Sequence, residues 1–146
     1  MEASEAAARE AIRDTIARYA HGADTGHFDE VAGCFTEGGV LEIEGGGRLE
    51  GRSAIRDYLG GVGHDRAAAP TDSYIRHHVS STWITVTSPT EATARSYFFV
   101  VTEHGTDHWG RYRDTLVPAD DRWLFAYRLA RTDGATPGGW AASRLK

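Results

Sequence analysis

The second half of the chain consists of four long runs of alternating and β-branched residues separated by short polar turns. The runs cover residues 73–87, 92–102, 109–117 and 122–131, and the turns between them read SPTE, EHGTDH and PADD. A period of two in such residues is typical of strands, and turns this short join antiparallel neighbours. The pattern therefore predicts a four-stranded antiparallel meander that must bury one face against other elements.

The first half of the chain supplies helices that can cover that face. Segment 4–23 places apolar side chains at helical spacing, and Ser4 can cap its start. Two shorter helices are predicted over 26–35 and 51–61, with a strand from Val40 and a flexible EGGGR turn between them. This order of elements predicts an α+β fold with a pocket on the inner face of the sheet.

The remaining segments are predicted as loops, and the length suits one domain. Residues 60–72 are expected to form a loop, and the polar, Gly-rich tail from Thr132 is expected to be loosely ordered. A chain of 146 residues fits a single domain, 1–146, whose core spans about 8–131.

Composition excludes several classes of partner. The net charge is −5 without a basic cluster, which argues against nucleic acid. No apolar run approaches the ~20 residues that span a bilayer, and the acidic N-terminus does not resemble a signal peptide. The single Cys34 cannot form an internal disulfide and is expected to be a core residue. We therefore expect a cytoplasmic protein whose main partner is a small molecule.

Histidines provide the first candidates for chemistry. His77 and His78 are adjacent in a predicted strand, so they should point to opposite faces, and the inward one is either a hydrogen-bonded core group or a base. His104 and His108 are four residues apart, a spacing that suits a metal on a helix. They lie in a Gly-containing turn without a Glu partner, so no metal site is predicted.

Four segments, in order and spacing, match a known family: 16–35, 51–59, 76–81 and 110–128. The chain resembles the SnoaL-like and scytalone-dehydratase-like branch of the fold shared with nuclear transport factor 2 and ketosteroid isomerase. The resemblance implies a cone-shaped, curved antiparallel sheet wrapped by three N-terminal helices. It also implies a homo-oligomer, from dimer to tetramer, packed through the outer face of the sheet.

Several members of that branch are acid–base enzymes without a metal or organic cofactor. Their recurring dyad is an Asp after the first helix and a His on the first long strand, and here Asp24 and His77 match it. Tyr19 matches a Tyr that precedes the Asp in some dehydratases. The second pocket His of scytalone dehydratase falls by ungapped counting at Thr102, with His104 two residues further on the same face.

These residue types suit proton transfer. A neutral imidazole can accept a proton near pH 7, and a carboxylate on its other nitrogen fixes the tautomer. The resemblance thus assigns His77 as base, Asp24 as its orienting partner and Tyr19 as hydrogen-bond donor, with His78 facing outward. Each has a plainer alternative: Tyr19 as core packing and Asp24 as a turn or cap residue.

Further substrate contacts are expected from the later strands. Arg128 in the last strand could bind an anionic or carbonyl oxygen, or form a salt bridge at the surface or an interface. The alternating aromatic residues near Tyr112 and Phe99 are mostly expected in the core, with a minority lining the pocket for a flat, largely apolar ligand. Trp83 and Trp123 are expected to be structural.

Three functions remain open at this point. The first is a cofactor-independent dehydratase or isomerase acting on a cyclic or polyketide-like metabolite. The second is a polyketide cyclase or epoxide-opening enzyme of the same fold. The third is a non-catalytic small-ligand-binding or accessory subunit, which is favoured if Asp24 and His77 do not touch.

Overall fold

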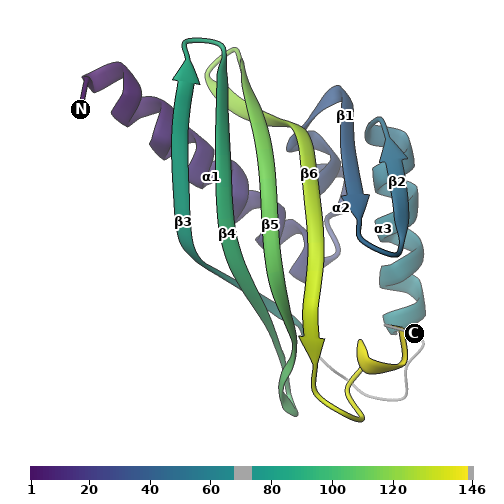
Figure 1. The fold of residues 1–146 in the computed structure, drawn as a ribbon. Helices are drawn as coiled ribbons and strands as arrows, with labels where there is room; N and C mark the ends of the chain where they lie inside the picture. The colour runs from purple at the N-terminus through teal and green to yellow at the C-terminus, as the bar shows by residue number, and fades with distance from the viewer. Residues whose placement is uncertain (68–73, 145–146) are drawn as a thin grey trace.

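The computed structural model describes residues 1–67 and 74–144. Three helices and two strands precede four long strands and a short 3₁₀-helix (Figure 1). In chain order these are α1 (Ala3–Thr25), α2 (Phe28–Gly33), β1 (Phe35–Ile43), β2 (Gly47–Glu50), α3 (Arg52–Ala67), β3 (Arg76–Ser88), β4 (Glu91–Thr102), β5 (Gly105–Ala119), β6 (Arg122–Ala135) and η1 (Ala142–Arg144).

The described strands form one open, curved sheet in the order β2-β1-β6-β5-β4-β3. The meander β3 to β6 is antiparallel throughout, as the short turns predict. One junction outside the meander is parallel, because β1 and β6 run in the same direction. These two strands are far apart in sequence, so no tight turn dictates their direction.

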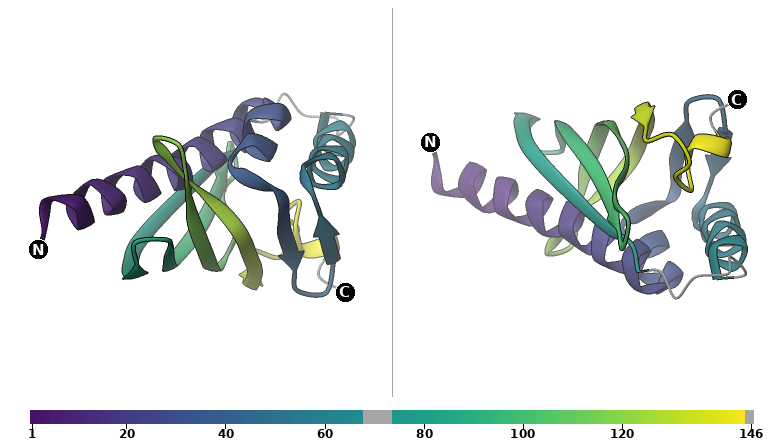
Figure 2. Two further views of the ribbon diagram at one scale, coloured as in Figure 1. Left: turned by 90° about the horizontal axis from the view of Figure 1, so that it is seen from above. Right: turned by 90° about the horizontal axis from the view of Figure 1, so that it is seen from below.

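The helices cover one face of the sheet, which we call the inner face; the opposite face is the outer face. Helix α1 runs across the inner face against β3 and β6, and α3 lies against β1 and β2 (Figure 2). The apolar stripe of α1 supplies Ile12, Ile16 and Tyr19 to the core. Phe35 and Phe125 meet them there, with ring centroids 5.2 Å apart. Burial of this stripe stabilises α1 on the sheet.

Several predicted element ends are wrong. Helix α1 begins after Glu2, and no side chain caps it, so Ser4 is not the N-cap. Helix α3 continues to Ala67 where a loop is expected from residue 60, and the rest of that predicted loop, 68–72, lies outside the described residues. No helix in the described parts of the chain is both long and apolar enough to cross a membrane.

Two strands of the meander, β5 and β6, are longer than the sequence pattern predicts. Strand β5 begins at Gly105, within the predicted turn EHGTDH. Strand β6 continues to Ala135, and residues 136–144 then form turns and η1 instead of a loose tail. This last segment contributes to the site below.

Candidate active site

A cavity of about 440 Å³ opens between the inner face of the sheet, the end of α1 and helix α3. Most of its lining is apolar, which suits a small ligand with little charge. The apolar side chains are Ala23, Phe28, Leu41, Ile43, Leu59, Val62, Ile75, Phe98, Ala130 and Trp140. The polar side chains are Tyr19, Asp24, Thr25, Tyr58, His77, His108, Tyr112 and Thr132.

Asp24 and His77 are in direct contact in this cavity. The Nδ1 atom of His77 lies 2.5 Å from Asp24 Oδ1. The backbone N–H of His77 also donates to the Asp24 carboxylate, with N···O distances of 3.1 and 3.0 Å. β3 is one of the two edge strands of the sheet, and Asp24 supplies the acceptor that a further strand would otherwise provide. Asp24 therefore fixes both the start of β3 and the orientation of the imidazole.

The two adjacent histidines point to opposite faces. His77 lines the cavity, whereas His78 is exposed on the outer face and stacks on Phe99, with ring centroids 4.8 Å apart and planes 6° apart. Because Nδ1 of His77 is held by a carboxylate, its Nε2 is the nitrogen left for a ligand. Among the described residues no side chain or backbone group bonds that Nε2.

Tyr19 and Tyr112 bring their rings to the floor of the cavity. Their ring centroids lie 6.0 Å apart, and the planes of the two rings are inclined by 74°. Burial raises the pKa of Tyr19, although the nearby Arg128 opposes this, and burial also raises the pKa of Tyr112. Both phenols therefore remain protonated near neutral pH and can act only as neutral donors or acceptors.

Arg128 lies behind these tyrosines, in the core, and is absent from the cavity lining. Its guanidinium forms a bidentate ion pair with Asp114, at 2.8 and 2.9 Å, and both side chains are fully buried. It also lies over the rings of Tyr19 and Tyr112, 4.3 and 3.8 Å from their centroids. The expected substrate contact is therefore wrong, and so is its alternative, a salt bridge at the surface or an interface.

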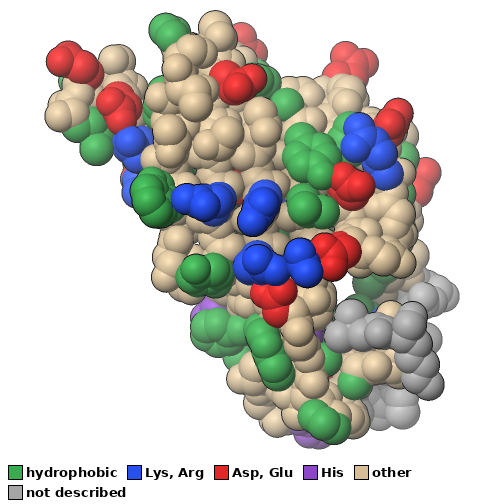
Figure 3. All heavy atoms as spheres, in the orientation of Figure 1, with side chains coloured by type: hydrophobic (Ala, Val, Ile, Leu, Met, Phe, Trp, Pro, Cys, Tyr) green, Lys and Arg blue, Asp and Glu red, His purple; other side chains and the backbone are tan. Residues whose placement is uncertain are grey.

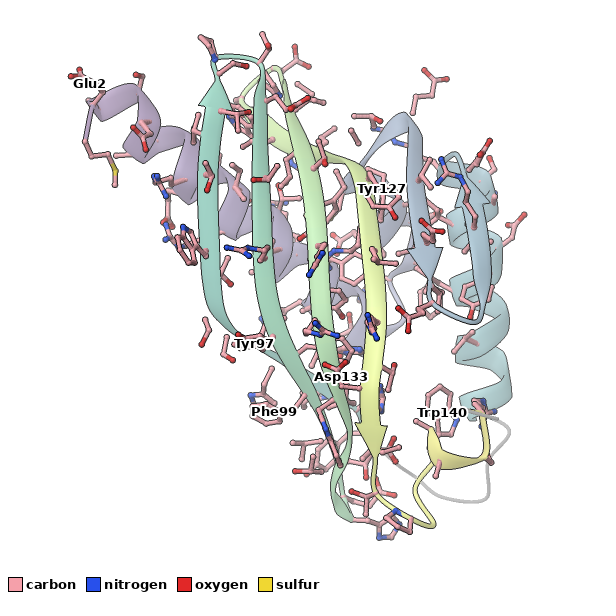
Figure 4. The ribbon with its side chains drawn as sticks, viewed as in Figure 1. Glu2, Tyr97, Phe99, Tyr127, Asp133 and Trp140 are labelled. Carbon is pink, nitrogen blue, oxygen red and sulfur yellow. The ribbon has the colours of Figure 1, made fainter. Side chains whose placement is uncertain are left out.

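Three other expected substrate contacts are not in the cavity. Phe99 is 39% exposed on the outer face (Figure 4). Thr102 is buried but absent from the cavity lining, and its hydroxyl accepts the backbone N–H of His104. The His104 side chain is 77% exposed and pairs with Glu103. The ungapped count therefore leads to two residues at the β4–β5 turn that do not line the cavity.

The second imidazole of the cavity belongs to His108, which the sequence pattern offers only as a partner of His104 in a metal site and not as a proton carrier. Its Nδ1 lies 2.8 Å from Asp107 Oδ2, so it repeats the arrangement of His77 and Asp24. Burial lowers the pKa of His108 below its usual value, although Asp107 opposes this. His108 is therefore mainly neutral near pH 7.

A β-bulge explains why the alternation of β5 misses this pair. Val100 pairs with His108 while Val101 pairs with Thr106, so Asp107 is an extra residue in β5. Such a bulge breaks the period of two, and both Asp107 and His108 are buried as a result. The same register places His77 opposite Val100, so the two imidazoles lie two strands apart, with backbones separated by about 10 Å.

The site thus holds two imidazoles, each with a carboxylate on Nδ1, and the neutral phenols of Tyr19 and Tyr112, around a mostly apolar cavity. This set can accept and return protons on a bound molecule. In the described part of the chain, no group of three or more His, Cys, Asp or Glu side chains is placed to hold a metal ion.

Comparisons with solved structures support the fold. A protein of unknown function from Mycobacterium tuberculosis, solved as a variant of Rv3472, is 33% identical, with a TM-score of 0.71 over 84% of this chain and 70% of that one. A candidate scytalone dehydratase from Novosphingobium aromaticivorans is 28% identical, with a TM-score of 0.79 over 93% and 91%. An NTF2-like protein with a cystatin-like fold from the same species is 27% identical, with a TM-score of 0.73 over 95% and 89%.

No curated protein matches the chain. A family model does: the one for the SnoaL-like domain matches residues 4–129, which include all three helices, the sheet as far as Leu129 and both carboxylate–imidazole pairs. With the NTF2-like fold of its structural neighbours, this match shows that the chain belongs to the SnoaL-like family of the NTF2-like superfamily.

Proposed function

We propose that the protein is a cofactor-independent acid–base enzyme of the dehydratase or isomerase type, in which His77 is the general base and Asp24 orients it. The observation that carries this proposal is the 2.5 Å contact between His77 Nδ1 and Asp24 Oδ1 at the wall of a cavity. The similarity to a candidate scytalone dehydratase favours the same reaction class.

The proton transfer follows from the acceptor-only chemistry of the carboxylate. Asp24 accepts the Nδ1–H of neutral His77, so the Nε2 lone pair is the base that takes a proton from the substrate. The ionised Asp24 then stabilises the imidazolium that forms. Tyr19, held neutral by burial, is the candidate donor to a developing oxyanion or a leaving hydroxyl.

The second carboxylate–imidazole pair gives the site a further proton carrier. Elimination of water needs one group to remove a proton and another to protonate the departing hydroxyl. His108 enters the same cavity two strands from His77, so it can take part on the other side of a bound molecule. Neither imidazole alone needs to perform both transfers.

The lining argues for the class of substrate. Aromatic and aliphatic side chains surround the polar groups, and no Lys or Arg is among the described lining residues. Such a cavity favours an uncharged, flat ligand over an anion. We therefore propose that the substrate is a small cyclic or polyketide-like metabolite. Analysis of the product would distinguish dehydration or isomerisation from cyclisation or epoxide opening.

Titration of the imidazoles by NMR tests the proposal before a substrate is known. We expect Asp24→Asn to change the protonated ring nitrogen or the pKa of His77, because an amide cannot replace an ionised acceptor. His77→Gln assigns the signal. His78→Gln is the matched control, since His78 is the adjacent residue on the outer face and should not respond to Asp24.

An unchanged His77 signal in Asp24→Asn would remove the orienting partner and leave a binding protein as the better hypothesis. Once a substrate is found, His77→Gln should lower kcat/KM by about 10²–10⁴-fold, the usual contribution of a general base. His78→Gln should leave kcat/KM nearly unchanged.

A further inference from the structure

The Asp107 carboxylate connects His108 to the C-terminal segment, by which we mean residues 136–144. Asp107 Oδ2 lies 2.8 Å from His108 Nδ1 and accepts the N–H of Ala141 at 3.1 Å. Asp107 Oδ1 accepts the N–H of Trp140 at 2.6 Å. Burial opposes ionisation here, but these three hydrogen bonds outweigh it and hold the pKa of Asp107 below its usual value. The carboxylate is therefore ionised, and each oxygen is occupied.

The close approach of the C-terminal segment depends on a glycine. A Cβ at Gly139 would lie only 2.6 Å from Asp107 Oδ1 and 3.1 Å from the Thr136 carbonyl oxygen. The segment is also attached by backbone, since the Thr136 N–H donates to the Asp107 carbonyl oxygen at 2.8 Å. A side chain at position 139 would therefore separate the segment from the carboxylate while leaving the charge of the carboxylate unchanged.

The C-terminal segment also supplies a wall of the cavity. Trp140 lines the cavity together with Leu59 and Val62 of α3, and its ring centroid lies 6.2 Å from that of His108 (Figure 4). The same carboxylate thus holds the backbone N–H of Trp140 and the Nδ1 of His108. The Asp107 carboxylate therefore both orients the imidazole and holds Trp140 against the cavity.

We propose that Asp107 is a positioning residue that couples the tautomer of His108 to the docking of the C-terminal segment, so that the second imidazole and the Trp140 wall are set together. The backbone N–H groups of the docked segment keep the Asp107 carboxylate ionised. Because an ionised carboxylate only accepts hydrogen bonds, the proton of neutral His108 stays on Nδ1 and Nε2 faces the cavity. The link to catalysis rests on the proposed function, but the coupling itself is a property of the unliganded protein.

Asp107→Asn tests the shared acceptor, because an amide has one oxygen for three donors. Its NH₂ group must face either the N–H of Trp140 or the Nδ1 of His108. We expect one of two results. Either the proton of neutral His108 moves from Nδ1 to Nε2, or amide hydrogen exchange at Trp140 and Ala141 accelerates about ten- to a hundredfold, which corresponds to the usual free energy of a hydrogen bond to a charged group. Asp133→Asn is the matched control, since Asp133 pairs with Arg111 instead.

Gly139→Ala tests the coupling without changing the carboxylate. We expect faster exchange at Trp140 and Ala141 together with a changed pKa or tautomer of His108. Faster exchange with an unchanged His108 would overturn the proposal, and so would an Asp107→Asn variant in which neither readout moves. These readouts report on His108, whereas the proposed function fails on His77 in Asp24→Asn, so the two failures are distinguishable.

Discussion

Each imidazole of the cavity is held at Nδ1 by a carboxylate of its own, and the two carboxylates are placed by different means. Asp24 comes from the last turn of α1, far from His77 in sequence, whereas Asp107 precedes His108 directly. The first pair depends on how α1 packs against β3, and the second on a local irregularity of β5. Loss of helix packing should therefore affect His77 before His108.

The lowered pKa of His108 predicts a pH-dependent stability. In the unfolded chain His108 titrates near pH 6.5, whereas its pKa is lower in the fold. Below pH 6.5 the unfolded chain therefore binds a proton at His108 that the folded chain does not bind. We expect the free energy of unfolding to fall between pH 7.5 and 5.5, and the fall to be smaller in His108→Gln. The pKa of Asp107 is also lowered, but the stabilisation that this gives is lost only as the pH falls near and below 4.

Urea denaturation at the two pH values measures this contribution, and the difference between wild type and His108→Gln isolates it from the other histidines. An equal pH dependence in the two proteins would show that the fold does not disfavour protonated His108.

At the scale of the elements, irregularities in the strands decide where side chains point. A bulge at Ser81, whose φ is 52°, reverses the alternation within β3 between Ser80 and Trp83. Trp83 therefore faces outward, 66% exposed under Arg95, and the expectation that it is structural is wrong. Trp123 is buried, as expected.

A register shift between β5 and β6, where Trp109 pairs with Gly134 and Gly110 with Thr132, depends on glycine. A Cβ at Gly110 would lie 2.0 Å from the Arg131 carbonyl oxygen and 2.8 Å from a ring carbon of Phe98. We expect Gly110→Ala to lower the free energy of unfolding by about 3 kcal/mol or more, because a backbone atom cannot move aside as a flexible side chain can.

Urea denaturation of Gly110→Ala and Gly38→Ala gives the comparison. Gly38 also lies in a strand, but a Cβ there meets nothing within 4 Å, so its replacement should change stability by no more than about 0.5 kcal/mol. Equal effects of the two substitutions would contradict the steric explanation.

At the scale of the whole molecule, the outer face of the sheet carries exposed aromatic side chains. Trp83, Tyr97, Trp109 and Phe99 are 66, 59, 41 and 39% exposed. Arginine side chains cross the middle of this face (Figure 3), and one of them, Arg111, is already paired with Asp133 at 2.9 Å. Exposed aromatic groups gathered on one face are typical of protein interfaces.

We propose that a second copy of the chain covers this face, as the family resemblance implies. Tyr97→Glu should then lower the measured mass toward that of a monomer, because it places a charge in a contact that must lose its water. Ala17→Glu, on the exposed side of α1, is the control and should leave the mass unchanged. Light scattering over a range of concentrations measures both, and a wild type that stays monomeric throughout would refute the interface.

Features that depend on local periodicity follow from the amino-acid sequence alone. Alternation with short turns predicted the meander β3–β6, and helical spacing with Gly-rich ends predicted three helices before it. Parity along β3 allowed only one of His77 and His78 to face inward, and the family resemblance chose His77. These inferences succeed because each rests on residues that are neighbours along one element.

The second half of the site depends on contacts between elements. Whether a strand carries a bulge depends on its register with the partner strand, which no local pattern specifies, so the sequence pattern places Asp107 and His108 in a turn. The same holds for Arg128, whose place in the core depends on Asp114 across the β5–β6 pair, and for Trp140, which reaches the cavity because Gly139 lets its segment approach Asp107. Contacts between elements set these positions, and periodicity along one element carries no information about them.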